Sequence, residues 1–127
     1  MSNKNFFRTV AIIGGGLIGT SLCLSIKKNN LCDAIKVYDS NIKVRKKLKE
    51  IIAPEQICEN LEDVVFDADL VVLCIPVGSM KEVAKSISEL MKDGCILTDT
   101  GSTKNSVIND VKPYISENIW FIPSHPL

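Results

Sequence analysis

The feature that most constrains this chain is an apolar run that passes directly into three spaced glycines. Residues 10–21 read VAIIGGGLIGTS, and the first four are β-branched or small, as is typical of a central parallel strand covered on both faces. Gly14, Gly16 and Gly19 then fit the spacing G-x-G-x-x-G. In this spacing the first glycine permits a tight turn, the second lets a pyrophosphate approach the backbone, and the third lets the next helix pack on the strand. The pattern predicts a helix whose free N–H groups face phosphates.

An acidic residue farther along tests this interpretation, because a lone glycine pattern is weak evidence. Residues 34–38 (AIKVY) indicate a second short strand, and Asp39 stands at its carboxyl end, where a carboxylate can accept both hydroxyl hydrogens of a ribose. The alternative is that Asp39 only caps a helix starting near Asn41. We favour a dinucleotide site, because the first strand, the glycines, the helix and the second strand follow one another in the order and spacing that such a site requires. Asp39 also predicts NAD rather than NADP, since it would repel a 2′-phosphate and residues 40–42 contain no arginine to receive one.

Strand-like and helix-like segments alternate along the whole chain. The expected strands are 8–14, 34–39, 56–58, 68–75, 95–99 and 119–122, and the expected helices are 17–28, 41–52, 61–66, 79–91 and 103–115. This alternation predicts an α/β fold of Rossmann type, with a doubly wound parallel sheet of about six strands in the order 3-2-1-4-5-6. The length of 127 residues, 46% of them hydrophobic, predicts a single domain over residues 1–127.

Composition excludes several other classes of function. Fifteen basic and fifteen acidic residues cancel, and the one basic run, residues 43–49, fits the solvated face of a helix, so we expect no nucleic-acid partner. Five cysteines without a C-x-x-C pattern indicate neither a disulfide framework nor a metal site, and they suit a reducing cytoplasm. No apolar run approaches the roughly 20 residues of a membrane span, so we expect no membrane partner.

Ligands of open α/β sheets bind at the carboxyl ends of the strands, which selects the candidate site. The residues expected to bind the cofactor are Gly14, Gly16, Leu17, Ile18, Gly19, Asp39, Ser40, Ile75, Pro76 and Gly101. His125, the only histidine, follows the last expected strand and could accept the proton of a substrate hydroxyl while a hydride leaves. A surface loop residue is the alternative for His125. For Ser102, which follows the strand 95–99, the alternative is a helix N-cap ahead of Asn105.

Five segments, in this order and spacing, resemble the NAD-binding domain of prephenate dehydrogenases: AIIGGGLIGTSL, VYDS, DADLVVLCIPV, ILTDTGSTK and FIPSHPL. The resemblance covers nearly the whole chain. It implies an NAD-dependent dehydrogenase of tyrosine biosynthesis that converts prephenate to 4-hydroxyphenylpyruvate by oxidative decarboxylation, with arogenate as the aminated variant of the substrate. It also implies that His125 contacts the substrate's ring hydroxyl and that Ser102 positions substrate and nicotinamide.

The resemblance also implies a part that this sequence does not contain. Family members continue past the S-H-P motif into a helical domain that completes the substrate pocket and makes a homodimer, whereas this sequence stops at Leu127. Only Arg8 and Arg45 are available as forked anchors for the two carboxylates of prephenate. We therefore expect the chain alone to bind NAD with little or no turnover, and to dimerise only with that domain. Two alternatives are a related hydroxyacid dehydrogenase domain and a non-catalytic NAD-binding module.

Overall fold

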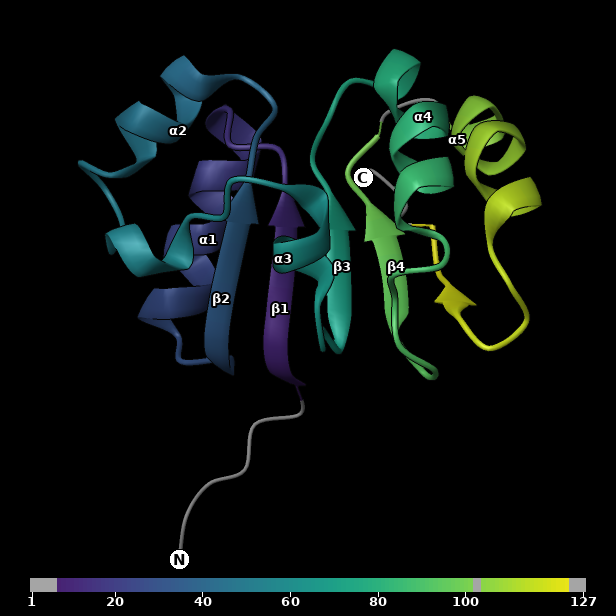
Figure 1. The fold of residues 1–127 in the computed structure, drawn as a ribbon, viewed down its shortest axis with the longest axis horizontal. Coiled ribbons are helices and arrows are strands. Elements are labelled where there is room, and N and C mark those ends of the chain that lie inside the picture. The colour runs from purple at the N-terminus through teal and green to yellow at the C-terminus, as the bar shows by residue number, and fades with distance from the viewer. Residues whose placement is uncertain (1–6, 102–103, 124–127) are drawn as a thin grey trace, which may run out of the picture.

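A five-stranded parallel sheet forms the centre of the computed structural model, which describes residues 7–101 and 104–123. The strand order is β2-β1-β3-β4-β5 (Figure 1). The strands are β1 (Phe7–Ile13), β2 (Cys32–Tyr38), β3 (Leu70–Leu73), β4 (Ile96–Asp99) and β5 (Trp120–Phe121). The helices are α1 (Leu17–Lys28), α2 (Ile42–Leu48), α3 (Leu61–Val65), α4 (Val77–Ile87) and α5 (Lys104–Val111), with 3-10 turns η1 (Pro54–Gln56) and η2 (Lys112–Tyr114).

Alternation of side chains along the central strands divides the core into two layers. Ala11 and Ile13 of β1 belong to one buried cluster, and Val10 and Ile12 belong to the other. Because successive side chains of a strand point to opposite faces, an unbroken apolar run is what a strand covered on both faces requires. The run at residues 10–13 is therefore the middle of the sheet, paired with β2 on one side and β3 on the other.

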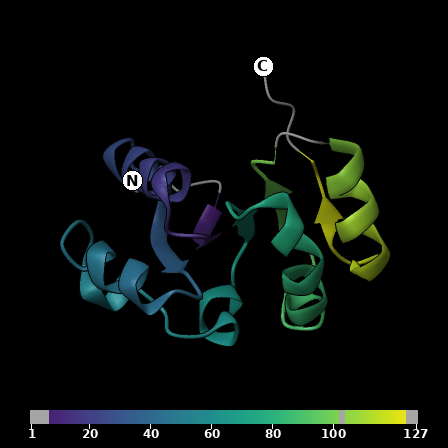
Figure 2. The ribbon, with the colours of Figure 1, turned by 90° about the horizontal axis from the view of Figure 1, so that it is seen from above.

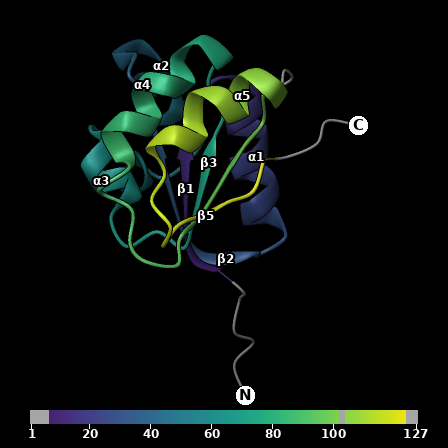
Figure 3. The ribbon, with the colours of Figure 1, turned by 90° about the vertical axis from the view of Figure 1, so that its right-hand side faces the viewer.

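Helices cover both faces of the sheet, as the prediction of a doubly wound fold requires. Helix α1 lies on one face, and α3, α4 and α5 lie on the other (Figures 2 and 3). Cys23 and Ile26 of α1 pack with Val10 and Ile12, whereas Met80 and Ala84 of α4 pack in the opposite cluster. The Rossmann-type architecture expected from the sequence is thus confirmed.

The expected number of strands was too high by one within the described residues. Segment 56–58 is not a strand, because Pro54 starts a 3-10 turn and leaves only an isolated parallel bridge between Val37 and Ile57. That bridge lies beside β2, where the expected order places the third strand. The other five strands therefore keep their expected order. Helix α2 ends at Leu48, four residues before the expected Ile52.

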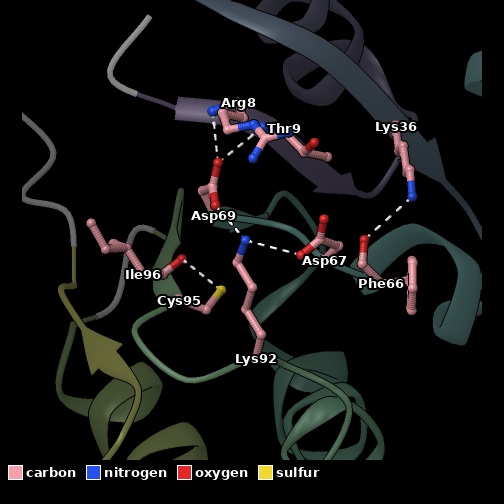
Figure 4. Close-up of polar contacts among 9 residues, drawn as sticks. All are labelled: Arg8, Thr9, Lys36, Phe66, Asp67, Asp69, Lys92, Cys95 and Ile96. Atoms are coloured by element: carbon pink, nitrogen blue, oxygen red, sulfur yellow. Dashed lines mark hydrogen bonds and ion pairs between the residues drawn. The ribbon is translucent and has the colours of Figure 1, made fainter.

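The carboxylate of Asp69 ties together the amino ends of the central strands. Its Oδ2 accepts hydrogen bonds from the amides of Arg8 at 2.6 Å and Thr9 at 3.1 Å, and its Oδ1 lies 2.6 Å from Lys92 Nζ (Figure 4). Lys92 also contacts Asp67 Oδ1 at 3.1 Å. Burial pushes the pKa of Asp69 upward, but the hydrogen bonds from Lys92 and the two amides together hold this pKa below its ordinary value.

We expect Asp69→Asn to remove an acid-sensitive part of the stability. The unfolded-state pKa is about 3.9 and the folded-state pKa is lower, so this stabilisation is complete above about pH 4 and is lost as the pH falls through the folded value. The free energy of unfolding of the wild type should exceed that of the variant by about 1 to 2 kcal/mol at neutral pH, and this difference should vanish in acid. Urea unfolding across pH measures the gap.

The matched control is Asp67→Asn, which removes the other, 64% exposed partner of Lys92. It should change the free energy of unfolding by less than about 0.5 kcal/mol, because exposed ion pairs contribute little. A gap between wild type and Asp69→Asn that stays constant down to about pH 2 would contradict the assignment.

Candidate nucleotide-binding site

The carboxyl ends of β1, β2, β3 and β4 meet at one edge of the sheet and are bonded to one another there. Gly14 N donates to Tyr38 O at 2.7 Å, and Cys74 N donates to Ile13 O at 2.7 Å. Thr100 N donates to Leu73 O at 3.0 Å. The turns that follow these strands therefore form a continuous rim, which is where open α/β sheets bind ligands.

Two of the three patterned glycines are needed for the fold itself. Gly14 has a φ of +114°, and a Cβ on it would lie 2.3 Å from the carbonyl oxygen of Cys74. A Cβ on Gly19 would lie 1.8 Å from the carbonyl oxygen of Gly14, far inside any tolerated contact. Helix α1 can therefore begin this close to the end of β1 only because residue 19 has no side chain.

Gly16 differs from the other two because it faces open space. It is exposed, and a Cβ on it would have no described atom within 4 Å. It is the N-cap of α1, without a side-chain cap, and the first turn of the helix contains no acidic residue. The N–H groups of that turn are thus available to an anion, and the helix dipole favours negative charge there.

Leu17 and Ile18, both predicted to contact the cofactor, open this helix at the rim. Their exposed fractions are 86% and 59%, although both are large apolar side chains. The structure therefore places an open backbone surface and two uncovered apolar residues side by side, next to the glycine turn.

The carboxylate of Asp39 lies directly beside the glycine turn. Its Oδ2 accepts from Gly15 N at 2.9 Å, and its Oδ1 accepts from Asn41 N at 2.8 Å. The N-cap of α2 is Asn41, whose own side chain accepts from Lys43 N at 2.8 Å. Asp39 is therefore not the N-cap of that helix. Its carboxylate is fixed against the turn on which a pyrophosphate would rest, next to the exposed Ser40.

Arg45 of helix α2 also lies beside Asp39, although it falls outside residues 40–42. Its Nη1 donates to the backbone oxygen of Asp39 at 2.6 Å, and its guanidinium lies 5.9 Å from the centre of the Tyr38 ring. Helical spacing could have indicated this contact, because a residue one turn after the N-cap Asn41 lies close to the start of the helix. A positively charged group therefore lies close to Asp39, and this Arg45 guanidinium is hydrogen-bonded to the Asp39 carbonyl.

The ends of β3 and β4 continue the rim beyond the glycine turn. Ile75 is half-buried and Pro76 is exposed, directly before α4, whereas Gly101 is buried after β4. Cys74 directly follows β3. Burial raises the pKa of its thiol to about 11, and a hydrogen bond with the Thr100 side chain lowers that pKa only in part. Cys74 is therefore a neutral thiol at physiological pH and adds no charge to the rim.

Ser102 and His125, the predicted catalytic residues, lie outside the described residues. Within the described ranges no group of three or more metal-ligating side chains occurs, and all five cysteines are free. None of the helices in those ranges has the length and apolar character to cross a membrane. The described part of the rim thus combines the open first turn of α1 with the carboxylate of Asp39.

Comparisons with known proteins find relatives that match nearly the whole chain. A family model described as prephenate dehydrogenase, nucleotide-binding domain, matches residues 22–127. A cyclohexadienyl dehydrogenase from Zymomonas mobilis is 36% identical over 121 residues, which cover 95% of this chain and 41% of that protein. A prephenate dehydrogenase from Lactococcus lactis is 30% identical over 125 residues, which cover 94% of this chain and 34% of that protein.

Among solved structures, prephenate dehydrogenase from A. aeolicus in complex with hydroxyphenyl propionate and NAD+ is similar with a TM-score of 0.81 and 26% identity. The match covers 94% of this chain and 42% of that chain. This chain therefore spans less than half the length of each of these three relatives.

The contrast between Gly16 and Gly19 gives a stability test. We expect Gly19→Ala to cost more than about 2 kcal/mol of unfolding free energy, because its Cβ would overlap the Gly14 carbonyl oxygen. Gly16→Ala should cost less than about 1 kcal/mol, because it meets no described atom and alters only an N-cap preference. Denaturant unfolding of both variants measures the difference. Equal losses would show that α1 does not pack on Gly14 as described.

Proposed function

The chain belongs to the family of prephenate dehydrogenase nucleotide-binding domains, and from that membership we propose that residues 1–127 are the NAD-binding domain of a longer prephenate dehydrogenase. The observation that carries the cofactor part is the pairing of Asp39 with the glycine turn. One carboxylate oxygen is bonded to Gly15 N, immediately before the open Gly16. A ribose diol on Asp39 and a pyrophosphate on the first turn of α1 would then be adjacent, as they are in a dinucleotide.

The proposed reaction is the oxidative decarboxylation of prephenate, or of its aminated form arogenate. Bound NAD supplies the hydride acceptor. His125 accepts the proton of the ring hydroxyl as the carbon bearing that hydroxyl gives up its hydride. The ring carboxylate leaves as CO2, its bonding electrons make the ring aromatic, and the resulting phenolate takes a proton back. Ser102 holds the substrate against the nicotinamide. The family membership and the order of these residues after β4 and β5 support both roles.

The binding of the substrate's carboxylates is assigned to residues beyond this chain. Arg8 lies at the amino end of β1, where its amide contacts Asp69 at the opposite edge of the sheet. Arg45 lies beside Asp39, and its guanidinium bonds the Asp39 carbonyl. Neither arginine stands beyond β3, where the substrate would meet the nicotinamide. The relatives are more than twice as long as the matched segment, and their additional length can supply the anchors and a homodimer contact.

The setting of the proposed enzyme follows from its cysteines. All five thiols are free, and Cys23 and Cys95 are buried in the core. Free, buried thiols fit a reducing compartment, so we place the enzyme in the cytoplasm.

Cofactor choice is the first test of this proposal. We expect the chain to bind NAD at least about tenfold more tightly than NADP, roughly 1.4 kcal/mol, because a 2′-phosphate would meet the Asp39 carboxylate. Asp39→Asn should narrow that ratio, since Arg45 is close enough to attract the phosphate once the negative charge is gone. Calorimetric titration of both nucleotides gives the ratio. Equal affinities for the wild-type chain would rule out this role of Asp39.

Turnover is the second test. We expect the 127-residue chain to bind NAD but to produce almost no NADH from prephenate, because holding the two reactants together can be worth about 7 to 11 kcal/mol of barrier. A steady-state absorbance assay measures NADH. Robust turnover that His125→Ala abolishes would show that this chain needs no further residues, and turnover that ignores this substitution would remove His125 from the mechanism.

A further inference from the structure

One charged side chain at the rim has no role in the proposed reaction. Asp99, the last residue of β4, is 1% exposed, and it is the one buried charged side chain among those whose burial the structure describes. Burying a carboxylate is costly unless hydrogen bonds replace its water. Its position at the carboxyl end of a strand, and not in the middle of the core, indicates that its bonds organise the rim.

The hydrogen bond of Asp99 fixes the turn that follows β4. Its Oδ2 accepts from Gly101 N at 2.7 Å, so the chain folds back over the carboxylate. Gly101 is buried, and a Cβ on it would lie 2.8 Å from Val107 Cγ2 and 3.0 Å from Asp99 Oδ2. The backbone at 99–101 is therefore held between the carboxylate and helix α5, and its path follows from both.

This turn is joined to the glycine turn through the end of β3. Thr100 donates from its backbone N to Leu73 O at 3.0 Å, and its hydroxyl lies 3.4 Å from the same oxygen. The next residue, Cys74, donates to Ile13 O and presents its own carbonyl to Gly14. The 99–101 turn thus lies on the rim two strands from β1, on the side away from Asp39.

The two halves of a bound dinucleotide would lie over different strands. With its pyrophosphate on the first turn of α1 and its adenosine ribose on Asp39 over β2, its other half extends over β3 and β4. We propose that Asp99 is a positioning residue for that half: by fixing the Gly101 amide, it sets the backbone turn against which the nicotinamide ring rests. The inference rests on the proposed NAD binding and adds a residue that the glycine pattern does not reveal.

Comparison of NAD with ADP-ribose, which lacks only the nicotinamide, tests this role. In calorimetric titrations we expect Asp99→Ala to weaken NAD binding about fivefold, the scale of one hydrogen bond, and to change ADP-ribose affinity less than about twofold. A merely structural role would weaken both ligands alike. The matched control is Leu97→Val, two residues earlier on the same face of β4, which disturbs the core without touching the turn and should leave the ratio of the two affinities unchanged.

Gly101→Ala provides a second variant that acts on the same hydrogen bond and leaves the carboxylate in place. Its Cβ would press on Asp99 Oδ2 and Val107, so it should give the same selective loss of NAD affinity even where Asp99→Ala folds poorly. An equal loss of affinity for both ligands, or no loss for either, would overturn the role of Asp99 but not the proposed NAD binding. A wild-type chain that binds neither ligand would contradict the proposed NAD binding, and the inference with it.

Discussion

The close approach of helix α1 to the end of β1 is the constraint on which the rest of the rim depends. It requires a residue without a side chain at Gly19, because a Cβ would lie 1.8 Å from the Gly14 carbonyl oxygen. The approach turns the first N–H groups of α1 outward over the sheet edge, beside Gly16. Asp39 then binds the Gly15 amide, so the end of β2 is linked to the same turn. The same turn therefore carries both the backbone that we propose for the pyrophosphate and the carboxylate that we propose for the ribose.

The two ends of the parallel strands differ in their contacts. At the amino edge, Asp69 accepts hydrogen bonds from the amides of Arg8 and Thr9 and forms an ion pair with Lys92. At the carboxyl edge, Gly16 is open and the apolar side chains of Leu17 and Ile18 are uncovered. This asymmetry is what parallel strands favour, because all their carboxyl ends and the turns that follow gather on one side.

The sequence was informative where a local pattern has one physical cause. The run at residues 10–13 and the spacing of three glycines predicted β1, α1 and their turn, and Asp39 was correctly expected at the carboxyl end of β2, directly after Tyr38. It was less informative where tertiary contacts decide. Residues 56–58 were expected to form a strand, but the 3-10 turn at Pro54 leaves a single bridge. The hydrogen bonds from Arg45 to the Asp39 carbonyl and from the Gly101 amide to Asp99 follow no periodic pattern in the sequence. The proposed roles of Ser102 and His125 stay predictions, since they fall outside the described residues.

We propose that NAD lies along the carboxyl edge with its pyrophosphate on the turn at Gly15 and Gly16. Titration of the isotope-labelled chain with NAD, followed by amide NMR shifts, tests it most directly. We expect the amide signals of Gly15, Gly16 and Asn41 to shift and to saturate, while those of Arg8 and Ile96 at the amino edge do not move. Shifts confined to the amino edge, or no saturable shifts at the glycine turn, would contradict it.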